Sequence, residues 1–253
     1  MKKSIQEMKQ ELIQASPSEA KILIEEYQKD ERKGVQNLVA GYYKEQEKIE
    51  KELQRLETMK FFEKKYEAFY SAICGVDEAG RGPFAGPVVA GAVILPKDCT
   101  IMYLNDSKKL NAEKRDLLYD EIKEKALAYG VGIVSPERID EINILEATYE
   151  AMQQAISNME ITPDLVLADA VTIPKITMKQ VGIIKGDAKS VSIAAASILA
   201  KVTRDRLMVE YDTIFPGYGF ASHKGYGSKA HIEAIQELGP CPIHRRSFIK
   251  KYI

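Results

Sequence analysis

The chain has 253 residues, 45% of them hydrophobic, which is enough for a full core in one large domain or in one domain with an extension. Its formal net charge is −1 at pH 7, so no global basicity points to a nucleic-acid partner. No apolar run approaches the ~20 residues that a membrane span needs, and the basic start MKKSIQEMKQ lacks the apolar stretch of a signal peptide.

The three cysteines, Cys74, Cys99 and Cys241, are far apart in the sequence and form no CxxC pair. This spacing is typical of reduced thiols in an intracellular protein and argues against a disulfide framework or a zinc site. We therefore expect a soluble, cytoplasmic protein that makes no use of a membrane.

Residues 1–70 differ in composition from the rest and are predicted to be helical nearly throughout, as an N-terminal extension. A helix start is predicted at Ser16, with Pro17 as the first helical residue and Glu19 completing a capping box. Apolar residues then recur at near-helical spacing, at Val35, Leu38, Val39, Tyr42, Ile49, Leu53 and Leu56. Two interpretations stay open: a helical hairpin packed on itself or on the main domain, and a surface that docks nucleic acid or protein.

From residue 71 to residue 253, short apolar runs alternate with helical segments. The predicted strands are 72–76, 87–95, 131–134, 165–168 and 181–184. The predicted helices are 112–129, 142–159, 191–211 and 228–238. Strands that alternate with helices are typical of an α/β layer fold with a central sheet.

The stretch Cys74–Pro87, CGVDEAGRGPFAGP, places the adjacent acids Asp77 and Glu78 at the end of an apolar run. A glycine–arginine–glycine turn, Gly80–Arg81–Gly82, follows at once. The chain has four other adjacent acid pairs, but these lie in polar, helix-like surroundings, where a solvated face is the default interpretation. Paired acids that enter a glycine-rich turn can hold a divalent cation beside backbone N–H groups, an arrangement that suits chemistry on a phosphate backbone.

Two further acids follow apolar runs: Asp169 after 165–168, and Asp187 after 181–186. Side chains at strand ends leave the sheet, so four carboxylates can converge if these strands lie side by side. Carboxylate oxygens favour Mg²⁺ or Mn²⁺. For each acid alone a capping role is the alternative, and Asp187 could cap the following helix.

Charge is uneven along the chain. Residues 201–253 contain 9 Lys and Arg against 5 Asp and Glu, together with all three histidines, His223, His231 and His244. A local basic surface beside an acidic metal site would be compatible with a polyanionic substrate. The histidines show no spacing typical of a nucleophile triad or a metal cluster, so we expect structural roles or phosphate contacts.

The segment that contains the paired acids, GVDEAGRGPFAGPVVAGAVIL, resembles ribonuclease HII, as do four further segments in the same order. These are NDSKKL at 105–110, DA at 169–170, KGDAKSVSIAAASILAKVTRD at 185–205 and SHKGYGSKAH at 222–231. The resemblance spans roughly residues 71–250. It implies a ribonuclease H-like layered α/β fold for residues 71–253, with a central mixed sheet flanked by helices and a helical C-terminal cap.

Carried over residue by residue, the resemblance implies that Asp77, Glu78, Asp169 and Asp187 hold two divalent ions, Mn²⁺ or Mg²⁺, for in-line hydrolysis of a phosphodiester. The turn at 80–82 would read the ribose 2′-OH, the group that distinguishes RNA from DNA. The remaining substrate contacts are assigned to Tyr226, which would stack on the neighbouring deoxyribose, and to Lys108 and Lys185, which could touch phosphate or be merely solvated.

The resemblance implies endonucleolytic cleavage of RNA in RNA/DNA duplexes, including single ribonucleotides embedded in DNA. Cleavage 5′ of the ribonucleotide would leave a 3′-OH and a 5′-phosphate. We expect a monomer, and whether a replication or transcription partner exists stays open.

Two rival functions also stay open. A ribonuclease HIII-like hybrid nuclease is disfavoured by Arg81 in the turn and by Asp187, where that family usually has Glu. A non-catalytic nucleic-acid-binding protein is disfavoured by the four acids, because a binder gains nothing from concentrated negative charge beside a polyanion.

Overall fold

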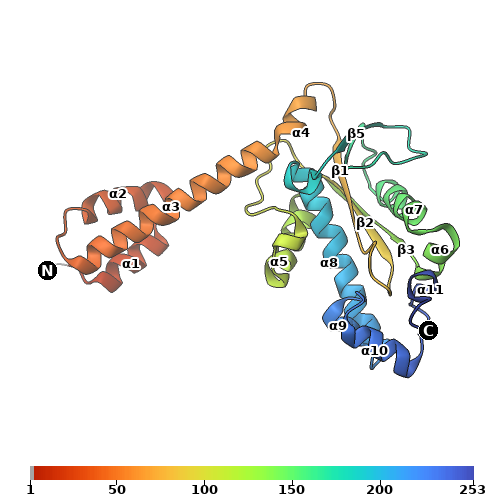
Figure 1. Ribbon diagram of the computed structural model, residues 1–253. Coiled ribbons are helices and arrows are strands. Elements are labelled where there is room, and N and C mark those ends of the chain that lie inside the picture. Colours follow the sequence, from red (N-terminus) through yellow and green to blue (C-terminus); the bar gives the residue numbers. More distant parts are fainter. Residues whose placement is uncertain (1–2) are drawn as a thin grey trace. The chain divides into compact units, whose positions relative to one another are not determined.

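The computed structural model describes residues 3–253, which divide into two compact units, Met1–Arg55 and Leu56–Ile253 (Figure 1). The division falls inside helix α3 (Lys33–Met59), and the functional boundary expected after residue 70 stays a prediction. No helix within residues 3–253 is both long and apolar enough to cross a membrane.

The N-terminal unit is helical, as predicted. It contains α1 (Ile5–Gln14), α2 (Pro17–Tyr27) and most of α3. The expected capping box is present: the Ser16 backbone N–H donates to Glu19 Oε2 at 2.8 Å, and the Glu19 N–H donates to Ser16 Oγ at 3.4 Å. Residues from all three helices form its core, namely Met8, Ile24, Tyr27, Val35 and Val39.

The larger unit is built on a five-stranded mixed sheet in the order β3-β2-β1-β4-β5. The strands are β1 (Ile73–Ala79), β2 (Val88–Ile94), β3 (Ala128–Val134), β4 (Leu165–Asp169) and β5 (Lys179–Ile183). β2 pairs antiparallel with β1 and β3, whereas β4 runs parallel to β1 and β5 parallel to β4. The predicted α/β fold with a central mixed sheet is therefore confirmed.

Helices cover both faces of this sheet (Figure 1). On one face, α7 (Ile144–Ser157) packs against β2 and β3, and on the other, α8 (Val191–Ile214) packs against β1 and β2. The remaining elements are α4 (Phe61–Tyr66), η1 (Ser107–Lys109), α5 (Ala112–Lys125), α6 (Pro136–Ile142), η2 (Gly186–Ala188), α9 (Phe220–His223), α10 (Lys229–Leu238) and α11 (Arg246–Ile249). The last three form the expected helical C-terminal region.

Alternation along β1 decides which residues meet which helix. Cys74 and Val76 join the core that contains α7, whereas Ile73 packs with Ile193 of α8. Because successive side chains of a strand point to opposite faces, Asp77 lies on the α8 side. The strand pattern therefore directs the first of the predicted acids toward α8.

Two predicted helices differ from the structure. The helix expected at 112–129 ends at Lys125, because the chain returns to the sheet and Ala128 pairs with Ile94 of β2. The helix expected at 142–159 is α7, which begins at Ile144, and a separate helix that was not predicted, α6, ends just before it at Ile142. Asn143 has a φ of 70° and accepts hydrogen bonds on its side chain from the first turn of α7, so it caps a new helix.

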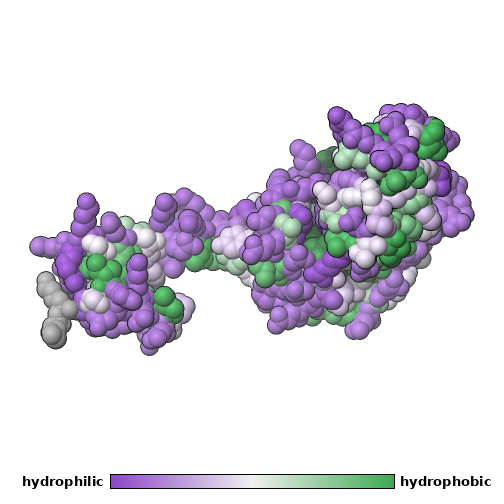
Figure 2. All heavy atoms as spheres, turned by 90° about the horizontal axis from the view of Figure 1, so that it is seen from below, coloured by the Kyte–Doolittle hydropathy of each residue, from purple (hydrophilic) through white to green (hydrophobic). Residues whose placement is uncertain are grey.

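Hydrophilic residues cover most of the face shown in Figure 2, with smaller hydrophobic areas between them. This agrees with a charged fraction of 29% in a chain whose sheet is buried on both faces.

We predict that Gly75→Ala destabilises the larger unit by about 1–3 kcal/mol. A Cβ at this β1 position would collide with the backbone carbonyl group of Ser192 on α8, which cannot move without shifting the helix. Chemical denaturation should show a lower midpoint. Gly41→Ala is the control, since nothing lies within 4 Å of that site, and an equal loss there would contradict the packing argument.

Candidate active site

The carboxyl ends of three adjacent strands bring the predicted acids to one edge of the sheet. β1 and β4 pair with Val76 opposite Ala168, so Asp77 and Asp169 are the next residues of each strand. β5 pairs with β4 on the other side, and Asp187 follows it in η2. The strands thus lie side by side, as convergence of the acids requires.

Asp77 is the most buried of the four acids, with 6% of its surface exposed. Ser197 on α8 donates a hydrogen bond to its carboxylate, and Ser197 Oγ lies 2.9 Å from Ser107 Oγ. Burial raises the pKa of Asp77 well above its usual value, the charge of Glu78 raises it further, and the Ser197 hydrogen bond opposes both effects. Buried hydroxyls thus hold a carboxylate whose charge is poorly neutralised.

Glu78 is half-buried and turns toward the glycine turn. Its Oε1 lies 3.3 Å from Nη1 of Arg81, three residues along the chain. Burial raises the pKa of Glu78, the charge of Asp169 adds to this, and the charges of Arg81 and Lys108 lower it. The Arg81 guanidinium therefore serves as a local counter-charge for this acid.

Asp169 and Asp187 are connected through η2. The Gly186 N–H donates to Asp169 Oδ1 at 2.7 Å and so fixes the turn that carries Asp187. Burial raises the pKa of Asp187, and its neighbour Asp106 raises it further through its charge, whereas Lys108 lowers it. Asp106 was not predicted as a site residue, although it lies inside the segment NDSKKL at 105–110.

The four acids fit a hard divalent cation by chemistry, because all of them offer carboxylate oxygens. Within residues 3–253, no three or more His, Cys, Asp and Glu side chains are grouped closely enough to hold a metal ion. Two of the acids contact other side chains instead: Glu78 pairs with Arg81, and Asp187 lies within hydrogen-bond reach of Asp106. Burial and like charge raise the pKa of three of the acids, and a bound cation would offset both effects.

The predicted ribose-reading turn lies directly after β1. Gly80 has a φ of 93°, which favours glycine, and a Cβ there would collide with the side chain of Arg204. Tyr226 is 47% exposed and lies beside the turn, because a Cβ added at Gly82 would be 3.9 Å from its Cε1 atom. The structure therefore places Tyr226 next to the turn, and its stacking on a deoxyribose stays a prediction.

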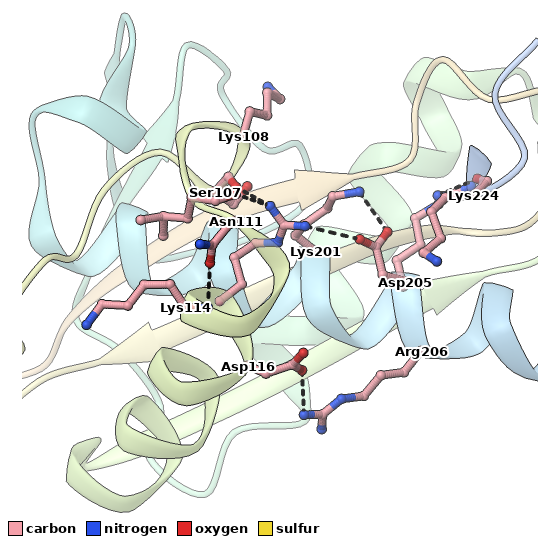
Figure 3. Close-up of polar contacts among 12 residues, drawn as sticks. Ser107, Lys108, Asn111, Lys114, Asp116, Lys201, Asp205, Arg206 and Lys224 are labelled. Carbon is pink, nitrogen blue, oxygen red and sulfur yellow. Dashed lines mark hydrogen bonds and ion pairs between the residues drawn. The ribbon is translucent and has the colours of Figure 1, made fainter. Parts of the chain in front are cut away.

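The two predicted lysines lie on the surface near the acids. Lys108 is exposed, and its charge lowers the pKa of Glu78 and of Asp187. In Figure 3 the Lys108 side chain points away from the polar contacts drawn below it. Lys185 is exposed, with a φ of 57°, immediately before η2. Contact of either lysine with phosphate stays a prediction.

Comparison with known proteins identifies the family. A sequence model described as Ribonuclease HII matches residues 74–251, and one described as Ribonuclease HII N-terminal domain matches residues 4–67. The chain belongs to the ribonuclease HII family. Ribonuclease HII of Lachnoclostridium phytofermentans is 62% identical over 226 residues, 89% of each chain. Ribonuclease HII of Clostridioides difficile is 53% identical over 252 residues, 99% of each chain.

A solved structure agrees with this assignment. The crystal structure of the ribonuclease H2 from Pyrococcus horikoshii OT3 matches with a TM-score of 0.59 and 30% identity, over 71% of this chain and 96% of that one. The family resemblance and the hydrolytic endoribonuclease class predicted from the sequence are therefore confirmed, and the HIII alternative is not supported. The match to an N-terminal domain of the same family covers the segment that sequence motifs had left unassigned.

The region behind the ribonuclease HII site contains a polar network between η1, α5 and α8 (Figure 3). Lys201 Nζ lies 2.7 Å from Asp205 Oδ1, and Arg206 Nη2 lies 2.8 Å from Asp116 Oδ1. Asn111 caps α5 by accepting from the Lys114 N–H at 2.8 Å. The Arg206–Asp116 pair joins α5 to α8, whereas the other two contacts each lie within one helix and its cap. Arg115 of α5 connects the network to η1, because its Nη1 donates to the Ser107 carbonyl at 3.0 Å.

Only some of the Lys and Arg residues that give residues 201–253 their excess of positive charge are exposed and unpaired. Arg204 and Arg245 are 1% and 0% exposed, and Lys201 is paired with Asp205. The local basic surface expected from the residue count is therefore weaker than that count suggested. The two buried arginines were also missed as functional candidates, because a charge count does not distinguish buried from exposed residues.

A buried histidine pair supports the Tyr226 loop from behind. The Cys241 N–H donates to His244 Nδ1 at 3.0 Å, so His244 carries its proton on Nε2. That proton is donated to His231 Nε2 at 3.0 Å, and His231 Nδ1–H then donates to the Tyr226 carbonyl at 2.9 Å. The expected structural role of the histidines fits these two, which must both be neutral for the chain of hydrogen bonds to form.

We predict that this histidine pair makes the protein acid-sensitive. Burial lowers the pKa of His231 and of His244 to about 4, against about 6.5 in an unfolded chain. Stability is therefore present in full above pH 6.5 and is lost as the pH falls from 6.5 to 4, by about 3 kcal/mol for one such histidine. Urea midpoints measured at several pH values will check this.

His244→Gln is the comparison variant for that measurement. It should be less stable at pH 7 but show a flatter pH dependence between 6.5 and 4. The raised pKa values of the active-site acids act in the opposite direction, yet they are present in both proteins and cancel in the difference. Parallel pH profiles for the two proteins would refute the histidine assignment.

Proposed function

We propose that this protein cleaves RNA in RNA/DNA duplexes, including a single ribonucleotide embedded in DNA. Cleavage occurs on the 5′ side of the ribonucleotide and leaves a 3′-OH and a 5′-phosphate. The observation that carries this proposal is the edge of the sheet where Asp77, Glu78 and Asp169 meet the turn at 80–82. Negative charge at this edge suits metal-assisted phosphodiester hydrolysis, and the adjoining turn suits close approach to a sugar.

Asp77, Glu78, Asp169 and Asp187 would hold two divalent ions, Mg²⁺ or Mn²⁺. Bound there, the ions supply an activated water nucleophile and neutralise charge on the leaving 3′ oxygen. The chain itself orients the acids: Ser197 holds Asp77, and the Gly186 N–H holds Asp169. To join the metal site, Glu78 would have to leave its contact with Arg81, and the guanidinium would then be available for a substrate phosphate.

Ribose selection is assigned to the turn Gly80–Arg81–Gly82, with Tyr226 stacking on the adjacent deoxyribose. Support comes from the position of the Tyr226 ring beside Gly82 and from its 47% exposure. Lys108 and Lys185 contact the flanking phosphates. The protein works as a monomer in the cytoplasm, and its nucleic-acid substrate is the partner that these surfaces fit.

We predict that Asp77→Asn abolishes at least 99% of cleavage while the fold persists, because an isosteric amide removes one charge from the metal site (about 10²-fold or more). The assay uses two labelled duplexes, one with a single ribonucleotide in DNA and one full RNA/DNA hybrid, with Mg²⁺ and with Mn²⁺. Asp120→Asn, at an exposed acid of α5, is the control and should cut both duplexes normally.

Three outcomes of this assay discriminate between functions. Cutting 5′ of the lone ribonucleotide supports the proposal, and cutting the hybrid alone favours the HIII-like alternative. Binding without cutting in either metal identifies a non-catalytic binder. Near-normal turnover by the Asp77→Asn protein contradicts the metal assignment.

Residues 1–55 are proposed to add substrate affinity. A deletion that tests this should end at residue 55, where the first unit ends, and not at residue 70. Glu63 must be kept, because it caps α8 by accepting from Ser190 Oγ at 2.5 Å and from the Ser192 N–H at 3.0 Å. We predict that deletion of residues 1–55 raises KM by about 3–10-fold, through lost phosphate contacts, and leaves kcat unchanged. Steady-state kinetics will test this, and an unchanged KM would leave only a stabilising or partner-docking role.

A further inference from the structure

Two arginines are fully buried behind the glycine turn. Arg204 on α8 is 1% exposed, and Arg245 in the C-terminal segment is 0% exposed. Within residues 3–253, neither guanidinium forms an ion pair with a carboxylate. Burial, and then the charge of Arg204, lower the pKa of Arg245 to about 9, so it stays charged at neutral pH. Two charges are thus buried with main-chain carbonyls as their hydrogen-bond acceptors.

The three hydrogen bonds of the Arg245 side chain all end on the loop between β1 and β2. Its Nη2 donates to the Gly80 carbonyl at 2.5 Å, its Nη1 to the Arg81 carbonyl at 2.9 Å, and its Nε to the Gly86 carbonyl at 2.9 Å. A planar guanidinium has its donors in a rigid fork, so three such bonds fix both the position and the orientation of the peptide groups.

Arg204 reaches the same loop from α8 and joins it to the Tyr226 loop. Its Nε donates to the Pro87 carbonyl at 2.9 Å and its Nη2 to the Ala85 carbonyl at 3.0 Å. Its Nη1 donates to the carbonyl of Lys224, two residues before Tyr226, at 3.0 Å. A single buried side chain therefore fixes the spacing between the two loops proposed to contact the sugar backbone.

The orientation of the turn follows from the geometry of the peptide bond. In a planar trans peptide, the C=O of one residue and the N–H of the next point in opposite directions. The Gly80 and Arg81 carbonyls point inward to Arg245, so the N–H groups of Arg81 and Gly82 point away from it. Both of these residues are exposed. The N–H groups therefore face the side on which a substrate would bind.

Stability alone is a poor reason to keep these charges buried. A desolvated guanidinium costs several kcal/mol, and well-packed apolar residues often stabilise a core at least as well as buried charges. An apolar side chain cannot donate hydrogen bonds, so it could not fix the direction of three carbonyl groups as the guanidinium does. What the arginines add beyond packing is therefore the direction of the peptide groups in the turn.

We propose that Arg245, supported by Arg204, is a positioning residue for ribose recognition: it holds the Gly80 and Arg81 carbonyls inward so that the Arg81 and Gly82 N–H groups face the ribose oxygen of the substrate. This proposal rests on the proposed function, in which the turn at 80–82 reads the 2′-OH. Neither arginine touches the substrate. Their effect is on selectivity between ribose and deoxyribose.

The test compares Arg245→Lys with Arg246→Lys, a matched control at the exposed neighbouring arginine. Lysine keeps the charge, but its three donors lie on one nitrogen and cannot reproduce the planar fork of the guanidinium. Each substitution is made in the Asp77→Asn background, so that neither duplex is cut. Fluorescence anisotropy gives the Kd for a duplex with one ribonucleotide and for the same duplex made entirely of DNA.

The decisive quantity is the Kd for the all-DNA duplex divided by the Kd for the duplex that contains one ribonucleotide. We expect Arg245→Lys to lower this ratio by about tenfold, and Arg246→Lys to leave it unchanged. A merely structural defect lowers the active fraction for both duplexes equally and does not move the ratio. An unchanged ratio in folded Arg245→Lys and Arg204→Lys proteins would overturn the proposal.

Further measurements separate this proposal from the proposed function and cover variants that do not fold. Failure of the unmodified protein to cut at the lone ribonucleotide, or equal Kd values in the Asp77→Asn protein, would refute the proposed function instead. If neither lysine variant folds, NMR of the Asp77→Asn protein decides. The amide signals of Arg81 and Gly82 should shift more with the ribonucleotide duplex than with the all-DNA duplex, and equal shifts would overturn the proposal.

Discussion

The close packing of α8 on β1 and β2 is the constraint on which the rest of the site depends. A Cβ at Gly75 or at Gly91 would collide with the α8 backbone, so the helix lies directly on the sheet only because both residues are glycine. Ala194, Ala195, Ala196 and Ala200 of α8 are completely buried there. Small residues on both sides let two backbones approach closely and fix the height of the helix above the strands.

This packing places functional side chains in a row along α8. Ser190, Ser197 and Arg204 are each seven residues apart, about two helical turns, so they share one face of the helix. At the start of the helix, Ser190 donates a hydrogen bond to Glu63. Further along, Ser197 donates to Asp77, and Arg204 donates to the loop after β1. The same helix thus orients a carboxylate and a recognition turn, and a shift of α8 would disturb both together.

Sequence reasoning predicted that Asp77 and Asp169 lie at strand ends, but it missed the side chains that support this region, for a physical reason. Asp77 and Asp169 end apolar runs, and strand alternation and parallel pairing are strong local signals. Arg204 and Arg245 act on main-chain carbonyls of residues more than a hundred positions away, and such acceptors leave no mark in the sequence. The helix predicted at 142–159 begins two residues early, because the apolar pattern runs through Ile142 and does not reveal the cap at Asn143.

The C-terminal segment is therefore part of the recognition loop and not only a cap. The Gly86 N–H donates to the Ile243 carbonyl at 2.9 Å, and the Arg245 N–H donates to the Phe84 carbonyl at 2.8 Å. Ala85 also forms an isolated antiparallel β-bridge with His244, so a segment 159 residues away along the chain pairs with the loop after β1. A turn that must present N–H groups outward cannot satisfy its inward carbonyls by itself, because they are buried away from water. The segment around Arg245 supplies those donors, so the selectivity that we propose for the turn depends on a segment outside it.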